Sequence, residues 1–280
     1  MTTRRQFLQI TTLSAAATGL SARALAGKRV AAESPAPPLQ IGMAGYTFLK
    51  FSVDQSIAMM KRTGITTLSI KDFHLPLNSS DETISAVAEK FRSNGITIYA
   101  AGVIYMKTRE EVDRAFEYAK KLGVGMIVGV PSPELLPYTE QRVRANNIRV
   151  AIHNHGPEDK LYPSPVDVYD KISQMDPRMG LCLDIGHSLR AGTDPAKAIT
   201  DYGPRIFDLH IKDLNAAAKD AKPIELGRGV MDIPAVVKAL TGIGYAGKCS
   251  IEHEMDMTDP LPGIAESAGY FRGVLRTMTI

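Results

Sequence analysis

Short apolar runs alternate with longer amphipathic segments along most of the chain. The short runs are rich in aliphatic and β-branched residues, which is typical of buried strands. We predict eight such strands, at 40–44, 67–70, 97–101, 126–130, 149–153, 180–184, 206–211 and 248–252. Between them, segments such as 53–62, 81–92, 109–122 and 234–240 carry apolar residues at helical spacing.

Glycine or asparagine follows many of the predicted helices, just before the next strand. These residues are Gly64, Gly95, Gly123, Asn147 and Gly244, and they suit the left-handed turn that ends a helix. Eight strand–helix repeats in about 240 residues predict one α/β domain, a (β/α)8 TIM barrel. A doubly wound open sheet is the alternative, but the first strand lacks its usual G-x-G-x-x-G motif.

Residues 1–26 have the pattern of an export signal. Arg4 and Arg5 precede a weakly apolar run at 10–20, and Ala24-Leu25-Ala26 resembles a peptidase site. We predict a twin-arginine-type signal at 1–26, a flexible lead-in at 27–38 and the barrel domain at 39–280. A disordered or fraying N-terminal helix is the alternative. The run is too short and polar to span a bilayer, so we expect a periplasmic or exported protein without membrane insertion.

Composition and charge limit the classes of molecule that the protein is expected to bind. The 280 residues carry 33 basic and 30 acidic side chains, a net charge of +3. Arg4, Arg5 and Arg23 account for that excess, so a chain cleaved after residue 26 is neutral and no nucleic-acid partner is expected. Cys182 and Cys249 lie in apolar runs, which predicts core residues rather than a disulfide or a metal site.

The histidines gather where a TIM barrel carries its chemistry, at the carboxyl ends of the strands. All six lie at or just past predicted strand ends: His74, His153, His155, His187, His210 and His253. Because alternate residues of a strand share a face, the last four strands each direct one ligand inward, namely His153, Asp184, His210 and Glu252. This set predicts one divalent metal ion, with Mn²⁺, Co²⁺, Zn²⁺ or Fe²⁺ favoured over Mg²⁺. A buried polar network without metal is the alternative.

Four motifs resemble, in order and spacing, the xylose isomerase-like TIM barrels of the sugar phosphate isomerase/epimerase superfamily. They are Asp184-Ile-Gly-His187, Asp208-Leu-His210-Ile-Lys-Asp213, Leu226-Gly-Arg-Gly229 and Ser250-Ile-Glu252. The resemblance covers residues 39–277. It implies a metal ion on Asp184, His210, Glu252 and a residue of the fifth strand, with His187 and Arg228 contacting substrate oxygens. It also implies a small carbohydrate substrate and a homo-oligomer.

The fifth strand departs from the pattern of that superfamily. Its epimerases usually have Glu there, and the two facing carboxylates exchange protons with the substrate; this chain has His153 in Ala151-Ile-His-Asn-His-Gly156. A neutral imidazole bound to metal has no free lone pair with which to act as a base. A reaction with one base, Glu252, is therefore expected.

Elimination of a group β to a ketone needs one base and an acid for the leaving oxygen. His155, His187 and Lys71 are the candidate acids, and Lys212 and His74 are further candidates for substrate binding. Lys71 could instead pair with Asp72, and Lys212 with Asp213. The sequence thus predicts a metal-dependent enzyme that enolises a keto-sugar or keto-glycoside, ending in β-elimination of the 3-keto-glycoside lyase type.

Three other functions remain open at this stage. A ketose isomerase or epimerase acting on a free sugar or cyclitol is the main alternative. A periplasmic sugar-binding barrel without catalysis is another. Phosphodiester cleavage of the endonuclease IV type needs three zinc ions, and hence more ligands than the four found here.

Overall fold

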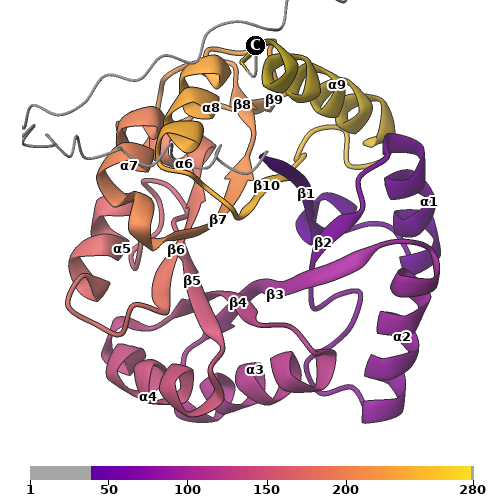
Figure 1. Cartoon of the computed structure of the whole chain (residues 1–280), viewed down its shortest axis with the longest axis vertical. Helices are drawn as coiled ribbons and strands as arrows, with labels where there is room; N and C mark the ends of the chain where they lie inside the picture. The colour runs from indigo at the N-terminus through magenta and orange to yellow at the C-terminus, as the bar shows by residue number, and fades with distance from the viewer. Residues whose placement is uncertain (1–38, 279–280) are drawn as a thin grey trace, which may run out of the picture. The chain divides into compact units, whose positions relative to one another are not determined.

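The computed structural model describes residues 39–278. The predicted signal at 1–26, the lead-in at 27–38 and the last two residues lie outside this range. Within it, parallel strands form a closed barrel in the order β1-β10-β7-β6-β5-β4-β3-β2 (Figure 1). The strands are β1 (Gln40–Ala44), β2 (Thr67–Ile70), β3 (Thr97–Met106), β4 (Met126–Pro131), β5 (Arg149–His153), β6 (Met179–Asp184), β7 (Ile206–Ile211) and β10 (Lys248–Ile251). The prediction of a (β/α)8 TIM barrel is confirmed.

Helices follow the barrel strands and surround them (Figure 1). They are α1 (Val53–Thr63), α2 (Asp81–Ser93), α3 (Arg109–Leu122), α4 (Leu136–Asn146), α5 (Pro165–Ile172), α6 (Ile185–Arg190), α7 (Pro195–Tyr202), α8 (Ile233–Gly242) and α9 (Leu261–Met278). Short 3-10 helices lie at η1 (Gly45–Phe48), η2 (Pro133–Leu135) and η3 (Gly203–Arg205). None of the helices in residues 39–278 is both long and apolar enough to cross a membrane.

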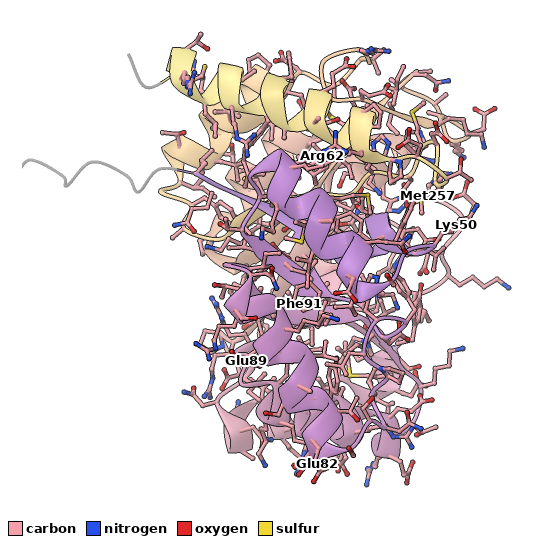
Figure 2. All side chains as sticks on the ribbon, turned by 90° about the vertical axis from the view of Figure 1, so that its right-hand side faces the viewer. Lys50, Arg62, Glu82, Glu89, Phe91 and Met257 are labelled. Carbon is pink, nitrogen blue, oxygen red and sulfur yellow. The ribbon has the colours of Figure 1, made fainter. Side chains whose placement is uncertain are left out.

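The helices start and stop as their sequences predict. Ser52 and Thr108 form capping boxes at the starts of α1 and α3, which satisfy free backbone N–H groups. The five predicted turn residues Gly64, Gly95, Gly123, Asn147 and Gly244 all have positive φ. Figure 2 shows α1 and α2 from outside the barrel, where Glu82 and Glu89 are exposed while Phe91 is buried against the barrel.

The third strand is longer than predicted. We predicted a strand at 97–101, but β3 continues to Met106. The pairing with β4 shifts register between Ala101 and Ile104 and then resumes. Gly102 has φ +151°, and a Cβ there would lie 2.0 Å from the Val128 carbonyl oxygen. The glycine thus permits a close approach of two strands instead of ending one.

The core lies inside the barrel and between its strands and helices. Cys182 and Cys249 are fully buried and unpaired, which confirms that they are core residues. After β7, β8 (Asp213–Leu214) and β9 (Pro223–Ile224) form a small antiparallel pair that the sequence did not predict. The last barrel strand ends at Ile251, one residue earlier than predicted. The Glu252 N–H still donates to the Ile211 carbonyl at 3.1 Å.

Candidate metal centre at the barrel mouth

Four buried side chains from consecutive barrel strands converge at the carboxyl end of the barrel. His153 and Asp184 end β5 and β6, His210 lies near the end of β7, and Glu252 follows β10. One ligand atom from each lies within 4.8 Å of the other three. His153 Nε2 lies 3.0 Å from His210 Nδ1 and 3.6 Å from Asp184 Oδ2. The structure therefore brings together the four predicted metal ligands.

Strand register explains the convergence. Asp184 is the Cα partner of His210 across β6 and β7, and His210 is the partner of Ser250 in β10. Partners on neighbouring parallel strands direct their side chains to the same side of the sheet. Glu252 lies two residues beyond Ser250 and keeps that orientation. His210 Nδ1 lies 3.3 Å from its Oε1.

The donor set fits a divalent metal ion. Tetrahedral sites with bonds of about 2.1 Å place ligand atoms about 3.4 Å apart, and the distances between neighbouring ligand atoms here are close to that. Asp184 Oδ2 is fully buried and lies 3.0 Å from the Lys212 ammonium, so this oxygen is ionic and turned toward the other three side chains. Burial lowers the pKa of His153 well below its usual value. Its imidazole is therefore neutral and able to bind metal.

Both carboxylates are ionised at neutral pH. Burial alone would raise the pKa of Asp184, but His187 and Lys212 hold it well below the usual value. The pKa of Glu252 is lowered in the same way, since Lys212 and His210 outweigh its burial. Two anionic oxygens thus face the rings of His153 and His210, a donor set found in the sites of transition metals. Burial would lower the pKa of His210, but Cys182 and Glu252 raise it well above the usual value. A metal ion would therefore displace a proton from that ring.

Lys212 contacts the same carboxylates from one side. Its Nζ lies 2.6 Å from Glu252, 2.9 Å from Glu254 and 3.0 Å from Asp184. Gly186 leaves room for this buried side chain, because a Cβ at position 186 would lie 2.5 Å from Lys212 Cγ. The alternative of a rim pair with Asp213 is wrong.

A cavity of about 290 Å³, the mouth cavity, opens at the barrel mouth beside His153 and Glu252. It is lined by Tyr46, Lys71, Val103, Tyr105, His153, His155, His187, Glu252 and Glu254. Three predicted catalytic or substrate-binding residues, Lys71, His155 and His187, thus share one cavity with two of the predicted metal ligands, His153 and Glu252. Lys71 also contacts Asp72 at 2.5 Å, which confirms the predicted pairing, while its role as an acid stays a prediction.

The histidines of the cavity are neutral at pH 7. Burial lowers the pKa of His155, and burial, the largest cause, lowers that of His187 to about 4. His155 Nε2 lies 3.2 Å from the Tyr105 hydroxyl, and His155 Nδ1 lies 3.4 Å from His153 Nδ1. Tyr105, His155 and His153 therefore form one hydrogen-bonded row along the cavity, whereas His187 Nδ1 lies 3.4 Å from Arg190.

Two predicted substrate-binding residues lie away from this cavity. His74 Nε2 lies 3.0 Å from the Phe51 carbonyl and 3.3 Å from the Ser56 hydroxyl, and the side chain is buried there. Arg228 is exposed, and its Nε donates to Glu266 Oε1 at 2.5 Å. Neither residue lines the mouth cavity.

The loop around Arg228 is organised by Asp213 instead. The Asp213 carboxylate accepts hydrogen bonds from the backbone N–H groups of Leu214, Gly227, Gly229 and Met231 at 2.8–3.0 Å. A Cβ at Gly229 would lie 2.3 Å from this carboxylate. The Leu226–Gly229 motif therefore shapes the loop through its backbone.

Sequence reasoning missed Tyr46 and Tyr105 and left the orientation of Glu254 open. Tyr46 directly follows β1, so the strand-end rule applied to the histidines could have found it. Tyr105 was missed because β3 was ended too early. Glu254 faces the cavity and binds Lys212. Burial, the largest cause, raises its pKa.

A polar layer lies deeper in the barrel. The Tyr99 hydroxyl donates to Asp208 Oδ2 at 2.8 Å and lies 2.5 Å from the Ser250 Oγ. Burial raises the pKa of Asp208 to about 7. Asp208 faces into the barrel, and its hydrogen-bond partner Tyr99 belongs to this lower layer.

Sequence and structure comparisons place the barrel among known proteins. The family model of xylose isomerase-like TIM barrels matches residues 57–274, which is more than half of the chain. The chain belongs to the xylose isomerase-like TIM barrel family. The resemblance found in the four motifs is thereby confirmed. No curated protein matches the chain in sequence.

Several solved structures share the family fold. The IOLI protein with a bound zinc atom is 18% identical, with a TM-score of 0.72 over 85% of this chain and 99% of that one. The 3-keto-D-glucoside 4-epimerase YcjR of E. coli is 15% identical, with a TM-score of 0.68 over 84% and 99%. The probable 3-DHS dehydratase AsbF of Bacillus anthracis is 11% identical, with a TM-score of 0.68 over 84% and 99%. At these sequence identities, the similarity to the solved structures establishes the fold of this chain alone.

Proposed function

We propose that the protein is a divalent-metal-dependent enzyme that enolises a keto-sugar or keto-glycoside and completes a β-elimination. The observation that carries this proposal is the convergence of His153, Asp184, His210 and Glu252 at the barrel mouth, where two of them, His153 and Glu252, line a cavity. A divalent ion held there supplies Lewis-acid polarisation of the substrate carbonyl. Family membership and the neighbours support a carbohydrate enzyme. One neighbour acts on a 3-keto-D-glucoside, another is a probable dehydratase and a third holds zinc.

In a 3-keto-glycoside, the hydrogen on C2 is acidic and the glycosidic oxygen on C1 is β to the ketone. A carboxylate removes the C2 proton, and the electron pair of that bond moves to form the C1–C2 double bond. The C1–O bond breaks, and its oxygen leaves with a proton from an acid. Water and redox partners are not consumed.

Two carboxylates at the cavity can accept the proton. Glu252 shares its oxygens between His210 and Lys212, whereas among the described residues only one oxygen of Glu254 has a partner, Lys212. Burial raises the pKa of Glu254, and a raised pKa makes a carboxylate a stronger base at neutral pH. Glu254 therefore joins Glu252 as a candidate base.

Lys71 is the best placed proton donor. His155 and His187 have lowered pKa values and are neutral at pH 7, so they hold no imidazolium proton to give. The Lys212 ammonium is surrounded by three carboxylates. Lys71 lines the cavity with its side chain only 16% exposed. We assign Lys71 to the leaving oxygen, with His155 and His187 binding substrate hydroxyls.

Isomerisation or epimerisation is the second candidate function, because Glu254 restores a second carboxylate to the site. Inversion at carbon needs proton exchange on opposite faces of the substrate. Glu252 and Glu254 share one ammonium, that of Lys212, and so lie on one side of the cavity. That arrangement favours elimination.

Aglycone release from phenyl 3-keto-glucoside by metal-loaded protein tests the proposal, with mass spectrometry in heavy water as the readout. Phenol release that disappears with EDTA and in Glu252→Gln supports the lyase. Deuterium uptake without cleavage favours isomerase or epimerase activity. Absence of both cleavage and exchange with Mn²⁺, Co²⁺, Zn²⁺ and Fe²⁺ contradicts enolisation altogether. Arg62→Ala, an exposed change on α1, serves as the matched control.

We also propose that the protein is exported through the twin-arginine-type signal at residues 1–26. A periplasmic enzyme meets free sugars and glycosides rather than cytoplasmic sugar phosphates. Fractionation of cells that express the full chain tests this. The paired change Arg4→Lys and Arg5→Lys is expected to retain the protein in the cytoplasm, and unchanged export would contradict the proposal.

A further inference from the structure

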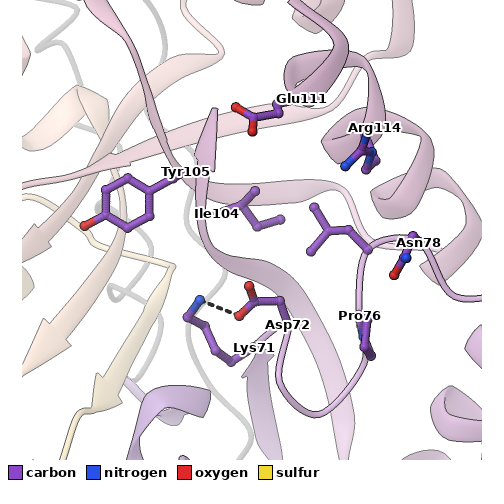
Figure 3. Close-up of a pocket in the computed structure, with 9 residues that line it drawn as sticks. Lys71, Asp72, Pro76, Asn78, Ile104, Tyr105, Glu111 and Arg114 are labelled. Atoms are coloured by element: carbon purple, nitrogen blue, oxygen red, sulfur yellow. Dashed lines mark hydrogen bonds and ion pairs between the residues drawn. The ribbon is translucent and has the colours of Figure 1, made fainter. Parts of the chain in front are cut away.

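A second cavity adjoins the mouth cavity at the ends of β2 and β3 (Figure 3). Its volume is about 380 Å³. Lys71 and Tyr105 line both cavities, so one ligand can extend from the first into the second. The mouth cavity alone, at about 290 Å³, lies at the lower end of the range for ligand pockets, about 300–1,000 Å³. A substrate larger than one sugar ring therefore needs the second space.

The lining of the second cavity suits a neutral, hydroxylated group. Ile104 lies between Tyr105 and Arg114 in the view of Figure 3. Asn78 and Arg114 line the cavity, and neither side chain has a hydrogen bond or ion pair within residues 39–278. An amide both donates and accepts, and a guanidinium offers five donors. These groups match the hydroxyl edge of a sugar ring, and Ile104 matches its apolar face.

The charges of the second cavity balance. Lys71 forms an ion pair with Asp72. The positive charge of Arg114 is offset, without direct contact, by the negative charge of Glu111, which also lines the cavity. Glu111 Oε2 accepts the backbone N–H groups of Lys107 and Thr108 at the start of α3. Equal numbers of cations and anions favour a neutral ligand over a phosphate or a carboxylate.

Tyr105 lies where the two cavities meet. Its side chain is 46% exposed, which is high for an aromatic residue, while its hydroxyl lies 3.2 Å from His155 Nε2. Aromatic rings offer a large apolar face at little cost in side-chain entropy. An exposed ring anchored to the active-site wall can stack on a sugar beside the bond that breaks.

We propose that this second cavity binds the leaving sugar of a two-ring keto-glycoside, so that the substrate is a neutral disaccharide with its ketone on the ring at the mouth. This inference rests on the proposed function and specifies its substrate class. Asn78 and Arg114 bind the hydroxyls of the leaving ring, and Tyr105 stacks against it. Arg114 determines specificity and takes no part in bond breaking.

Kinetics on substrates of two lengths test this inference. The probes are 3-keto-cellobiose, oxidised on its non-reducing ring, and methyl 3-keto-glucoside, each with metal-loaded protein. The wild type is expected to have a kcat/KM at least tenfold higher on the disaccharide. Arg114→Ala should remove about tenfold of that preference, as loss of a charged hydrogen bond does, with the ratio of kcat/KM on the two substrates as the readout. Arg62→Ala, also an exposed helical arginine, is the control.

Equal kcat/KM on both substrates, or an equal loss on both in Arg114→Ala, overturns the inference. A preference for the phenyl glycoside over the disaccharide overturns the assignment to a sugar. If neither substrate is cleaved, the proposed function fails, and titration calorimetry with unoxidised cellobiose and glucose tests the subsite separately. Several-fold tighter binding of cellobiose that Arg114→Ala abolishes supports the subsite, and equal affinities overturn it.

Discussion

Lys212 is buried among Asp184, Glu252 and Glu254, and a divalent ion on the predicted ligands would approach two of the same carboxylates. Removing this ammonium leaves buried anions uncompensated, which typically costs about 3–5 kcal/mol. We expect Lys212→Met to lower the free energy of unfolding by that amount in metal-free protein. Urea denaturation with and without Mn²⁺ measures it.

The same variant should gain more from metal than the wild type does, because the cation replaces the missing positive charge. Lys212→Arg, which keeps the charge, is the matched control. Equal stabilisation of wild type and Lys212→Met by Mn²⁺ would show that the ammonium and the metal do not share these carboxylates.

The roles of Glu252 and Glu254 can be distinguished by measuring metal affinity and kcat in variants of each residue. Glu252 is a predicted metal ligand, so Glu252→Gln should weaken Mn²⁺ binding at least tenfold, and activity should fall with it. Glu254 lies outside the four-ligand set, and Glu254→Gln should keep metal affinity while kcat falls by about 100-fold, as expected for a lost general base. Titration calorimetry and steady-state kinetics check both changes. Unchanged kcat in Glu254→Gln would leave Glu252 as the base.

The lowered pKa of His187 leads us to expect that the free energy of unfolding depends on pH. Its pKa is lowered by burial from the usual value of 6.5 to about 4. Between these values the unfolded chain binds more protons than the folded one, so stability falls as the pH is lowered through this window. The slope for one such group approaches about 1.4 kcal/mol per pH unit.

Denaturation of metal-free protein at several pH values between 4 and 7 measures this slope. His187→Gln removes the titrating group, so the slope should become shallower. The other buried histidines still titrate, and part of the slope should remain. The same slope in variant and wild type would show that His187 does not carry the effect.

Among the elements, the loop from β8 to α8 depends on one carboxylate. Asp213 accepts four backbone hydrogen bonds from this segment and is fully buried. Asp213→Ala leaves these donors without their acceptor, and hydrogen bonds to charged groups contribute about 1.5–3 kcal/mol each. We expect a loss of at least about 3 kcal/mol, and hydrogen exchange should show faster exchange at residues 227–231. Arg228→Ala should leave this exchange unchanged, since Arg228 lies on the outside of the loop.

Strands were predictable from the sequence because the barrel repeats one pattern. Seven of the predicted strands agree with the structure to within a residue at either end, and the glycine and asparagine turns all have positive φ. β3 was the exception, because its pairing with β4 shifts register between Ala101 and Ile104 and then resumes, which the pattern of apolar residues does not encode. Strand alternation also predicted the four ligands, because a side chain at a strand end has only two directions available.

Long side chains could not be placed in this way. Lys212 and Arg228 both belong to segments that follow a barrel strand. Lys212 is buried among carboxylates, whereas Arg228 pairs with Glu266 on the surface. Their directions depend on a gap at Gly186 and on a partner in α9, neither of which strand periodicity encodes. The same holds for the second cavity, whose lining comes from β3, α3 and the segment after β2.

For the barrel as a whole, metal binding should raise thermal stability. A ligand that binds only the folded state stabilises it by about 2.7 kcal/mol at 100 times its Kd. For a domain of this size, 1 kcal/mol shifts Tm by about 2–4 °C, so saturating metal should raise Tm by about 5–10 °C over EDTA-treated protein. Differential scanning calorimetry with Mn²⁺, Co²⁺, Zn²⁺ and Fe²⁺ measures this and ranks the metals.

The shift must depend on the four ligands if the barrel mouth is the binding site. His153→Gln removes one of them, and its Tm should respond to metal by less than half as much as the wild type, while its metal-free Tm stays within a few degrees. A metal at the protein surface would stabilise both proteins equally. Equal shifts would therefore place the metal elsewhere. The absence of any shift in the wild type would favour the buried polar network, in which Lys212 and His210 balance the carboxylates.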